Sequence, residues 1–255
     1  GLKGTYEVII PFPEGEYCKE VRIGSAIARA DVIVTMSHFK GHEMTEFGGA
    51  LKNIGMGSAS VGGKLHLHSD SQPVITRENC TGCRQCERNC RHGAVKVAED
   101  HVAVIDYALC VGCGQCIAVC QYDAATSGAP STVRELVAKI SEYALAVLRG
   151  KPHFHISFIT AVSPHCDCWG MNDIPVVPDL GMLASYDPVA LDQACFDLVK
   201  AAPAMAGSVA NPDGTQSRVG EDKFSLVHPR TDGLFGLEHA QKIGVGSRTY
   251  TLIEV

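Results

Sequence analysis

Eight of the twelve cysteines fall into two runs with the same spacing, C-x-x-C-x-x-C-x-x-x-C. The first run is Cys80, Cys83, Cys86 and Cys90, and the second is Cys110, Cys113, Cys116 and Cys120. Each cysteine of the second run follows its counterpart by 30 positions, and Gly82, Gln85 and Ala94 recur at the same offset. The stretch is therefore an internal duplication.

This spacing suits the ligation of [4Fe-4S] clusters. Three closely spaced thiolates let a short loop surround three irons, and in a duplicated unit the offset fourth thiolate ligates the other cluster. We expect two ligand sets: Cys80, Cys83, Cys86 and Cys120 for one cluster, and Cys110, Cys113, Cys116 and Cys90 for the other. Zinc sites and a disulfide framework are the alternatives, but structural zinc sites typically use two C-x-x-C pairs.

The segment from about residue 75 to 126 resembles bacterial two-cluster ferredoxins, with one departure. Those proteins carry proline after the fourth cysteine, whereas this chain has Arg91 and Gln121. Ligation should survive, because proline is not a ligand. Arg91 and His92 also place positive charge beside a cluster, which should raise its reduction potential.

A second group of chemically capable residues follows a predicted strand outside the cysteine runs. Asp31 to Ser37 is a nearly continuous apolar run, which is typical of a strand buried on both faces of a parallel sheet. Ligands of open α/β sheets bind beyond the carboxyl ends of the strands, and glycines 48 and 49 would allow a ligand to approach a helix start. The candidate catalytic residues in this region are His38, Lys40, His42, Lys52 and Asn53. An ordinary polar loop before a helix is the alternative.

Cys166 and Cys168 follow another predicted strand, at 154–162. This C-x-C pair could ligate a soft metal, form a redox disulfide or remain two free thiols, and the spacing leaves all three open. An additional metal or ligand at Cys166 and Cys168 is thus a further expectation beside the two clusters. Cys18 and Cys195 are expected to be structural, and Asp192 to lie on the polar face of a helix.

Strands and helices alternate along the rest of the chain. Periodicity predicts strands at 6–11, 64–68, 175–178 and 250–255, and helices at 21–30, 131–149 and 188–201. The expected fold class is α/β, a mostly parallel sheet covered by helices, with an inserted small α+β two-cluster ferredoxin-like domain. The expected domains are a discontinuous α/β domain, 1–74 with 127–255, and the insert, 75–126.

The composition narrows the function classes. The 255 residues are 45% hydrophobic and 20% charged with a formal charge of −6, as in many soluble globular proteins. Nothing favours nucleic acid as a partner, and no apolar run approaches the roughly 18 residues that span a bilayer. Cysteines in cluster spacing favour a reducing, low-oxygen cytoplasm. The oligomeric state is left open.

The combined motifs resemble the domain of unknown function 362 family of iron–sulfur proteins. The motifs are residues 37–42, 48–53, 166–168 and 187–192, interrupted by the ferredoxin-like unit. The resemblance covers essentially the whole chain and implies two [4Fe-4S] clusters and redox work, but no substrate. Members of the family usually carry further sequence before the point where this chain starts, so we expect an amino-terminal part to be missing.

Three functions are consistent with the sequence. The first is a ferredoxin-like, low-potential electron carrier whose partners are redox proteins. The second is a redox enzyme in which the clusters feed a metal site or a small anionic substrate in the α/β domain, and the third is a cluster scaffold or maturation factor. An enzyme requires His38, Lys40, His42, Cys166 and Cys168 to meet at one edge of the sheet, whereas a carrier does not.

Overall fold

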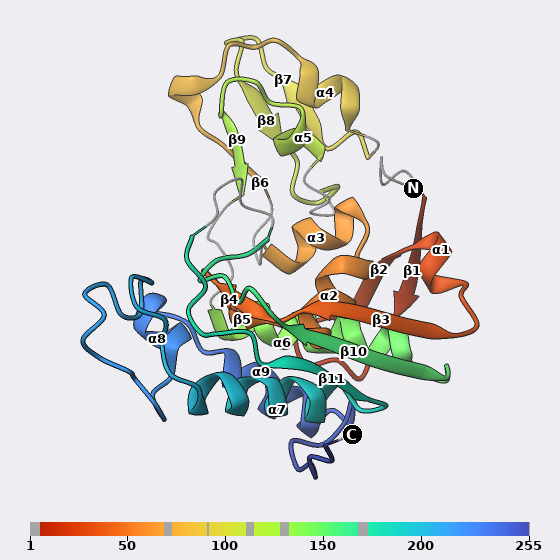
Figure 1. The fold of residues 1–255 in the computed structure, drawn as a ribbon. Coiled ribbons are helices and arrows are strands. Elements are labelled where there is room, and N and C mark those ends of the chain that lie inside the picture. Colours follow the sequence, from red (N-terminus) through yellow and green to blue (C-terminus); the bar gives the residue numbers. More distant parts are fainter. Residues whose placement is uncertain are drawn as a thin grey trace.

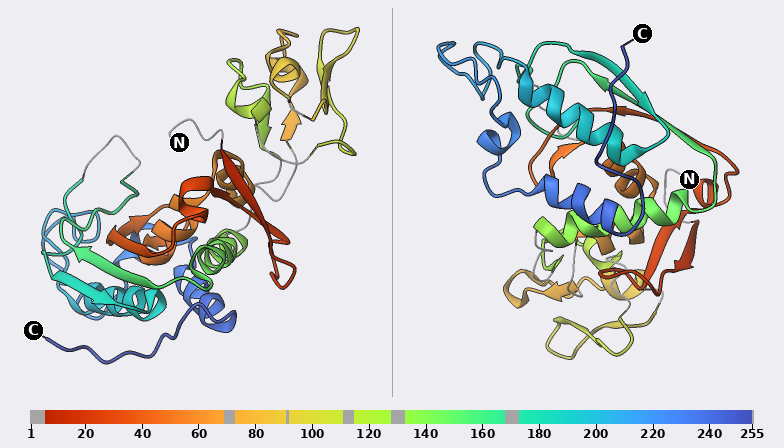
Figure 2. Two further views of the ribbon diagram at one scale, coloured as in Figure 1. Left: turned by 90° about the vertical axis from the view of Figure 1, so that its right-hand side faces the viewer. Right: turned by 90° about the horizontal axis from the view of Figure 1, so that it is seen from below.

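The structure, a computed structural model, describes residues 6–68, 73–90, 92–110, 115–127, 133–167 and 173–254. Residues 73–127, called the insert below, stand above the rest of the molecule in Figure 1 and project from it in Figure 2. The remaining residues form an α/β body. Buried apolar side chains make one large cluster in the body and a separate small one in the insert.

The central sheet of the body has three strands in the order β11-β10-β3. β10 (His153–Ile159) runs parallel to β3 (Ile33–His38) and antiparallel to β11 (Gly181–Ser185). The sheet is therefore mixed, and the mostly parallel sheet that we expected is not found in the described residues. A parallel strand needs a crossover connection, usually a helix, and no helix lies between β10 and β11 in the described residues 160–167 and 173–180.

Helices cover one face of this sheet in two layers. α2 (Ala50–Ser58) and α7 (Pro188–Ala201) pack against the strands, and α6 (Val133–Leu148) and α9 (Gly233–Lys242) lie beneath them (Figures 1 and 2). The predicted helices at 131–149 and 188–201 correspond to α6 and α7. Asp187 caps α7 by accepting hydrogen bonds from the backbone N–H groups of Val189 and Ala190, at 2.8 and 3.0 Å.

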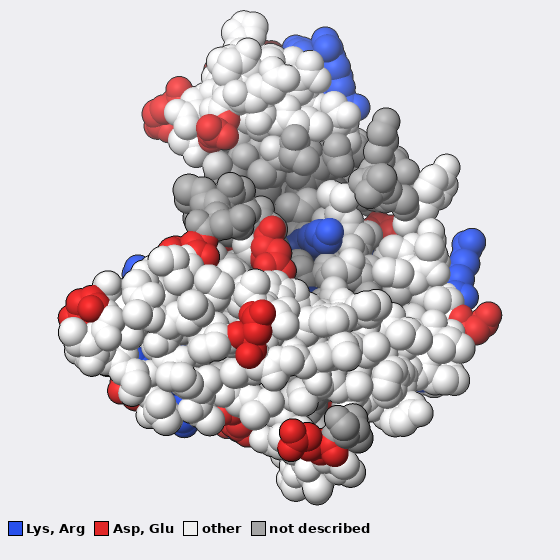
Figure 3. All heavy atoms as spheres, viewed as in Figure 1, with Lys and Arg blue, Asp and Glu red and all other residues white. Residues whose placement is uncertain are grey.

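The opposite face of the sheet is open to solvent. Val34, Met36 and Met182 are 63%, 66% and 61% exposed, and Figure 3 shows an almost uncharged surface over β3 and β10. The prediction that the strand at 31–37 is buried on both faces is therefore wrong. Its inward positions carry Ile33, Thr35 and Ser37, of which only Ser37 is buried, so the exposed Val34 and Met36 reflect strand propensity more than burial.

Smaller elements surround the body. β1 (Glu7–Pro11) pairs antiparallel with β2 (Glu20–Gly24), and β4 (Lys40–His42) with β5 (Glu46–Gly48). The short helices are α1 (Ser25–Ala28), α3 (Val61–His68) and α8 (Lys223–Val227). Among the described residues, no helix is long and apolar enough to cross a membrane.

Four local predictions in the body differ from the structure. The helix expected at 21–30 is β2 followed by the single turn of α1, and the strand expected at 64–68 lies within α3. α3 packs closely because Gly63 meets the Arg22 carbonyl, which a Cβ would approach to 2.2 Å. No strand forms at 175–178, where the chain bends at Val176 and Val177, or in the described residues 250–254.

The insert shows the sequence duplication in three dimensions. Its order is β6 (Pro73–Ile75), η1 (Arg77–Asn79), α4 (Gln85–Asn89), β7 (Val95–Val97), β8 (Ala103–Ile105), α5 (Gln115–Ala118) and β9 (Ala125–Ser127). β8 and β9 follow β6 and β7 by 30 positions. β6 pairs with β9 and β7 with β8, both antiparallel and in the equivalent register, so each repeat supplies a partner strand to the other.

Candidate functional site

Three cysteines of the first repeat and one of the second line a single hollow in the insert. They are Cys80, Cys83, Cys86 and Cys120. The hollow encloses about 340 Å³, including its open mouth, and Val97, Ala103 and Ala125 contribute apolar walls. This is the ligand set that the spacing groups together, and four thiols beside apolar walls fit the donor set of a [4Fe-4S] cluster, although Arg84 and Gln85 also line the hollow.

Backbone N–H groups point at the sulfur atoms of this hollow. Ala103 donates to Cys80 Sγ and Ala125 to Cys120 Sγ, both at 3.4 Å. Burial acts to raise the pKa of Cys120, but backbone N–H groups at Ala125, Tyr122 and Ala124 outweigh it, so the pKa falls below its usual range. Such hydrogen bonds stabilise a thiolate ligand and tune the potential of a bound cluster.

The loop that carries Cys80, Cys83 and Cys86 depends on a close backbone approach. Gly82 has a φ of +66°, and a Cβ there would lie 2.4 Å from the carbonyl oxygen of His101. Arg84 also has a positive φ, +62°. Two left-handed residues turn the chain around the hollow so that neighbouring cysteines face the same space.

The second expected ligand set is only partly described. Cys90, Cys110 and Cys116 belong to the same small core as the first set, while Cys113 lies outside the described residues. Within the described residues, no three His, Cys, Asp or Glu side chains are placed to hold one metal ion. The thiolates of a cubane each ligate a different iron, so they surround a space and need not converge on a point.

In the body, the end of β3 and the beginning of β4 bring His38 and Lys40 to one carboxylate. His38 Nδ1 lies 3.0 Å from both carboxylate oxygens of Asp167, and Lys40 Nζ lies 3.1 Å from Oδ2. His38 Nε2 lies 2.8 Å from the carbonyl oxygen of Thr160. Burial acts to raise the pKa of Asp167, but His38 and Lys40 outweigh it and lower the pKa.

Lys52 adds a second cation beside this group. Its ammonium lies 3.1 Å from Cys166 Sγ, although the two residues come from α2 and from the loop after β10. The backbone N–H of Cys166 donates to Glu43 Oε2 at 3.4 Å. A thiol next to an ammonium can be held as a thiolate, so these residues could bind or attack an electrophilic group. Cys168 lies outside the described residues.

Two of the predicted site residues have mainly local partners. His42 Nδ1 accepts hydrogen bonds from the backbone N–H groups of Met44 and Thr45, both at 3.1 Å. Burial first, and then the nearby charge of Lys52, lowers the pKa of His42 to about 4, so its ring is neutral. Asn53 donates to Ser37 Oγ at 2.9 Å and thereby fastens α2 to β3.

The structure corrects the role of Asp192, which the sequence placed on a polar helix face. Its carboxylate is fully buried and accepts hydrogen bonds from the N–H groups of Ala50 and Leu51, at 2.7 and 2.9 Å. Burial raises its pKa to about 7, partly offset by those bonds. Gly49 is required here because a Cβ would meet Asp192 Oδ1 at 2.2 Å. The glycines before α2 thus admit the chain's own carboxylate, which fixes α2 and with it Lys52.

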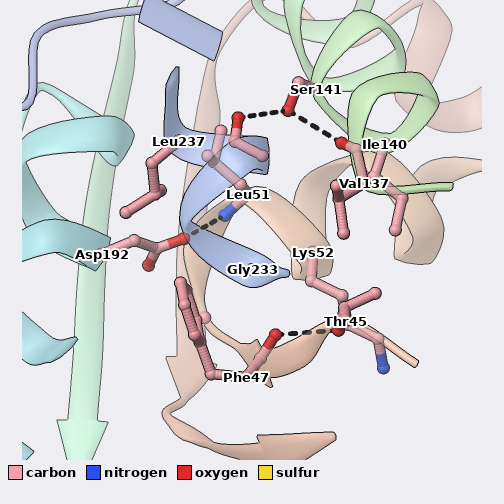
Figure 4. A pocket seen from close by; sticks show the side chains of 12 residues that line it. Thr45, Phe47, Leu51, Lys52, Val137, Ile140, Ser141, Asp192, Gly233 and Leu237 are labelled. Atoms are coloured by element: carbon pink, nitrogen blue, oxygen red, sulfur yellow. Dashed lines mark hydrogen bonds between the residues drawn. The ribbon is translucent and has the colours of Figure 1, made fainter. Parts of the chain in front are cut away.

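An apolar pocket lies behind Lys52, between α2, α6 and α9 (Figure 4). Leu51, Val137 and Leu237 line it, and Asp192 closes one side. The Lys52 ammonium points away from Leu237 and Asp192 in this view, so only its carbon stem faces the pocket (Figure 4). The pocket is therefore part of the packed interior, and the polar site lies on the other side of Lys52.

The sequence missed several residues of the body site. Asp167, Glu43 and the Thr160 carbonyl all contact predicted site residues. Asp167 could have been found, since it separates two cysteines that were themselves singled out. His228, whose Nε2 donates to the Pro164 carbonyl at 2.7 Å, carries no local pattern that would reveal it.

One comparison places the chain in a known family, and a second finds no match. The family model described as "Domain of unknown function (DUF362)" matches residues 1–197 of this chain. No curated protein matches it.

Proposed function

Because the chain belongs to the domain of unknown function 362 family, whose description names no activity, we propose from its own residues that it is a two-cluster iron–sulfur electron-transfer protein. The hollow lined by Cys80, Cys83, Cys86 and Cys120 is the observation that carries this proposal. When bound, two [4Fe-4S] clusters would supply one-electron transfer at low potential. Redox proteins would then be its partners, and the cytoplasm its compartment.

The chain's own residues would hold the clusters and shape their surroundings. Cys80, Cys83, Cys86 and Cys120 would ligate one cluster, with N–H groups of Ala103 and Ala125 stabilising the sulfur charge. Cys110, Cys113, Cys116 and Cys90 would ligate the other. The antiparallel pairing of β6 with β9 and of β7 with β8 supports this, because it relates the two repeats by an approximate twofold axis.

Iron and acid-labile sulfide in anaerobically prepared protein test the proposal. We expect about eight irons and eight sulfides per chain, since two sets of four thiolates have cubane spacing. Dithionite reduction should give paramagnetic resonance signals of two interacting clusters. About two to four irons per chain, or zinc in their place, would contradict the proposal.

A second candidate function is a redox enzyme in which the clusters feed the body site. The observation that favours it is that His38, Lys40, Lys52 and Cys166 meet, although a pure carrier needs no such group. Cys166→Ala with unchanged iron content but lost turnover in cell extract would support the enzyme. Cys195→Ala is the matched control, because Cys195 is a buried body cysteine on α7 without an ammonium partner in the described residues. Equal turnover of both variants and the wild type would leave the carrier as the function.

A further inference from the structure

We propose that His38 and Lys40 form a binding subsite for a small carboxylate-bearing ligand, and that the chain's own Asp167 carboxylate occupies it in this structure. The inference rests on the second candidate function and deepens it, because it names the class of substrate that the body site takes. The subsite itself is built by the body and can be tested without any turnover.

Asp167 shows that a carboxylate fits between His38 and Lys40. Both of its oxygens lie 3.0 Å from His38 Nδ1, and Oδ2 also lies 3.1 Å from Lys40 Nζ. Charge-assisted hydrogen bonds that engage both oxygens are the strong, geometrically specific way in which proteins recognise carboxylates.

Each ring nitrogen of His38 faces a hydrogen-bond acceptor. Its Nε2 faces the carbonyl oxygen of Thr160 at 2.8 Å, and its Nδ1 faces a carboxylate. Both partners are acceptors, so both ring nitrogens are satisfied only when each carries a proton. The subsite therefore directs a ring nitrogen of His38 and the Lys40 ammonium toward a single carboxylate.

His38 and Lys40 are better fixed than the carboxylate between them. His38 ends β3, Lys40 lies in β4, and Lys40 Nζ also donates to the carbonyl oxygen of His38 at 3.0 Å. The side chain of Lys40 is only 10% exposed, whereas that of Asp167 is 47% exposed and lies outside the strands and helices. Asp167 is thus the partner that can leave, and the poorly solvated Lys40 ammonium would then favour another anion beside it.

The reactive residues of the body lie next to this subsite. A Cβ on Gly48 would lie 3.5 Å from Lys40 Cε and 3.2 Å from Lys52 Cδ, so the two lysine stems flank the same glycine. Lys52 in turn contacts Cys166, the chain neighbour of Asp167. A ligand whose carboxylate replaced that of Asp167 would therefore have Cys166 and Lys52 beside it. A substrate bound through its carboxylate could then place its reacting group next to these two residues.

Asp167→Asn tests the subsite, because it keeps the shape of the side chain and removes the competing charge. We expect acetate, titrated calorimetrically at constant ionic strength with chloride as the balancing salt, to bind at least about tenfold more tightly than to the wild type. Adding Lys40→Gln to this variant should abolish the gain. Inorganic phosphate is the second probe, and tighter binding of phosphate than of acetate would overturn the assignment to carboxylates.

Glu16→Gln is a matched control elsewhere in the body. Glu16 is also about half exposed, at 48%, and its Oε2 lies 2.6 Å from Lys242 Nζ and 4.0 Å from His239 Nδ1. Lys242 is 65% exposed, so water can solvate it once the carboxylate is gone. We expect no gain in acetate binding. A gain in Asp167→Asn no larger than in Glu16→Gln, or one that survives Lys40→Gln, would overturn the proposal.

A second measurement covers the case in which Asp167→Asn does not fold. The ring ¹⁵N signals of His38 in the wild type should shift during an acetate titration, and signals unchanged by acetate would overturn the proposal. Iron and sulfide are determined on the same samples. Full clusters without an acetate effect overturn only this inference, whereas a wild type without clusters overturns the proposed function and leaves the acetate result standing.

Discussion

The cysteines of the insert and the buried cysteines of the body lie in different surroundings. In the body, Cys18 and Cys195 are fully buried, and burial first, then the neighbouring carboxylates of Glu142 and Asp192, raises the pKa of both thiols. They fill space as small apolar groups. In the insert, six cysteines of the two runs belong to its small core, beside seven apolar residues. The body is therefore stabilised by apolar burial, whereas the insert, on the function proposed above, would also depend on the clusters that its cysteines would hold.

Iron removal should have the largest effect and act on one region only. With the clusters chelated under reducing conditions, backbone amides of β7 and β8 should lose at least about a thousandfold of their hydrogen-exchange protection, because few apolar contacts remain to close the insert. Amides of β10 and α7 in the same sample are the internal control and should keep their protection. Equal loss of protection in both regions would show that the insert depends on the clusters no more than the body does.

Cys90→Ser should remove the cluster held by Cys110, Cys113 and Cys116. It should leave intact the cluster held by Cys80, Cys83 and Cys86, although Cys90 is nearer to these cysteines in sequence. We expect about half of the iron to be lost, because the offset cysteine of each run ligates the other cluster. Paramagnetic resonance of the reduced variant shows which signal disappears. Cys195→Ser should keep all the iron. Loss of the signal assigned to Cys80, Cys83 and Cys86 would reverse the ligand assignment.

The body should instead respond to pH, through Glu46. Burial first, and then a hydrogen bond with Asp222, raises its pKa to about 8. The unfolded chain releases this proton near pH 4.5 and the folded chain near pH 8, so stability falls as pH rises through that window. Glu46→Gln mimics the protonated acid, and its free energy of unfolding should exceed that of the wild type by roughly 4 kcal/mol at pH 8.

Urea unfolding of the body at pH 5 and pH 8, followed by circular dichroism, measures this difference. Glu238→Gln is the control, since that side chain is 59% exposed on α9, and it should follow the wild type. A Glu46→Gln variant whose stability falls with pH as steeply as that of the wild type would show that Glu46 does not carry the effect.

Two glycines with similar backbone angles, one in the insert and one in the body, give the smallest expected difference between the two regions. Gly82 in the insert and Gly150 after α6 have φ values of +66° and +71°, but only Gly82 has a neighbour where a Cβ would be. Gly150→Ala should destabilise the body by about 1 kcal/mol, the usual cost of a left-handed residue. Gly82→Ala should cost about 2 kcal/mol or more, because the clash with the His101 carbonyl is added. Urea unfolding of the insert is followed by cluster absorbance, and that of the body by circular dichroism. Equal losses of stability in the two variants would mean that the loop around Gly82 moves to accept the added Cβ.

Sequence reasoning works best where the chemistry is local. The spacing within each cysteine run, together with the repeat, predicts which four cysteines belong together. The first predicted set, Cys80, Cys83, Cys86 and Cys120, lines a single hollow in the structure. The contact of Lys52 with Cys166 joins residues 114 positions apart, so the sequence could suggest it only through the rule that strand ends share an edge.

The errors have physical causes that single sequences hide. Asp192 was misplaced because its burial depends on the start of α2, 142 positions earlier in the chain. The alternating pattern before His68 predicts a strand, but these residues lie in α3. Five residues are too few to separate a period of 2 from one of 3.6. The apolar run of β3 suggested a covered strand, although no element lies over Val34 and Met36 in the described part of the chain.

The pairing of β6 with β9 has a consequence for the history and engineering of the chain. Pro73 and Ser127 are opposite each other in that ladder, so the polypeptide enters and leaves the insert side by side. Neighbouring strands lie about 5 Å apart, a gap that two or three linking residues span. Residues 73–127 can thus be gained, lost or exchanged as a cassette without moving the ends of the host chain, as insertions at adjacent surface points generally allow.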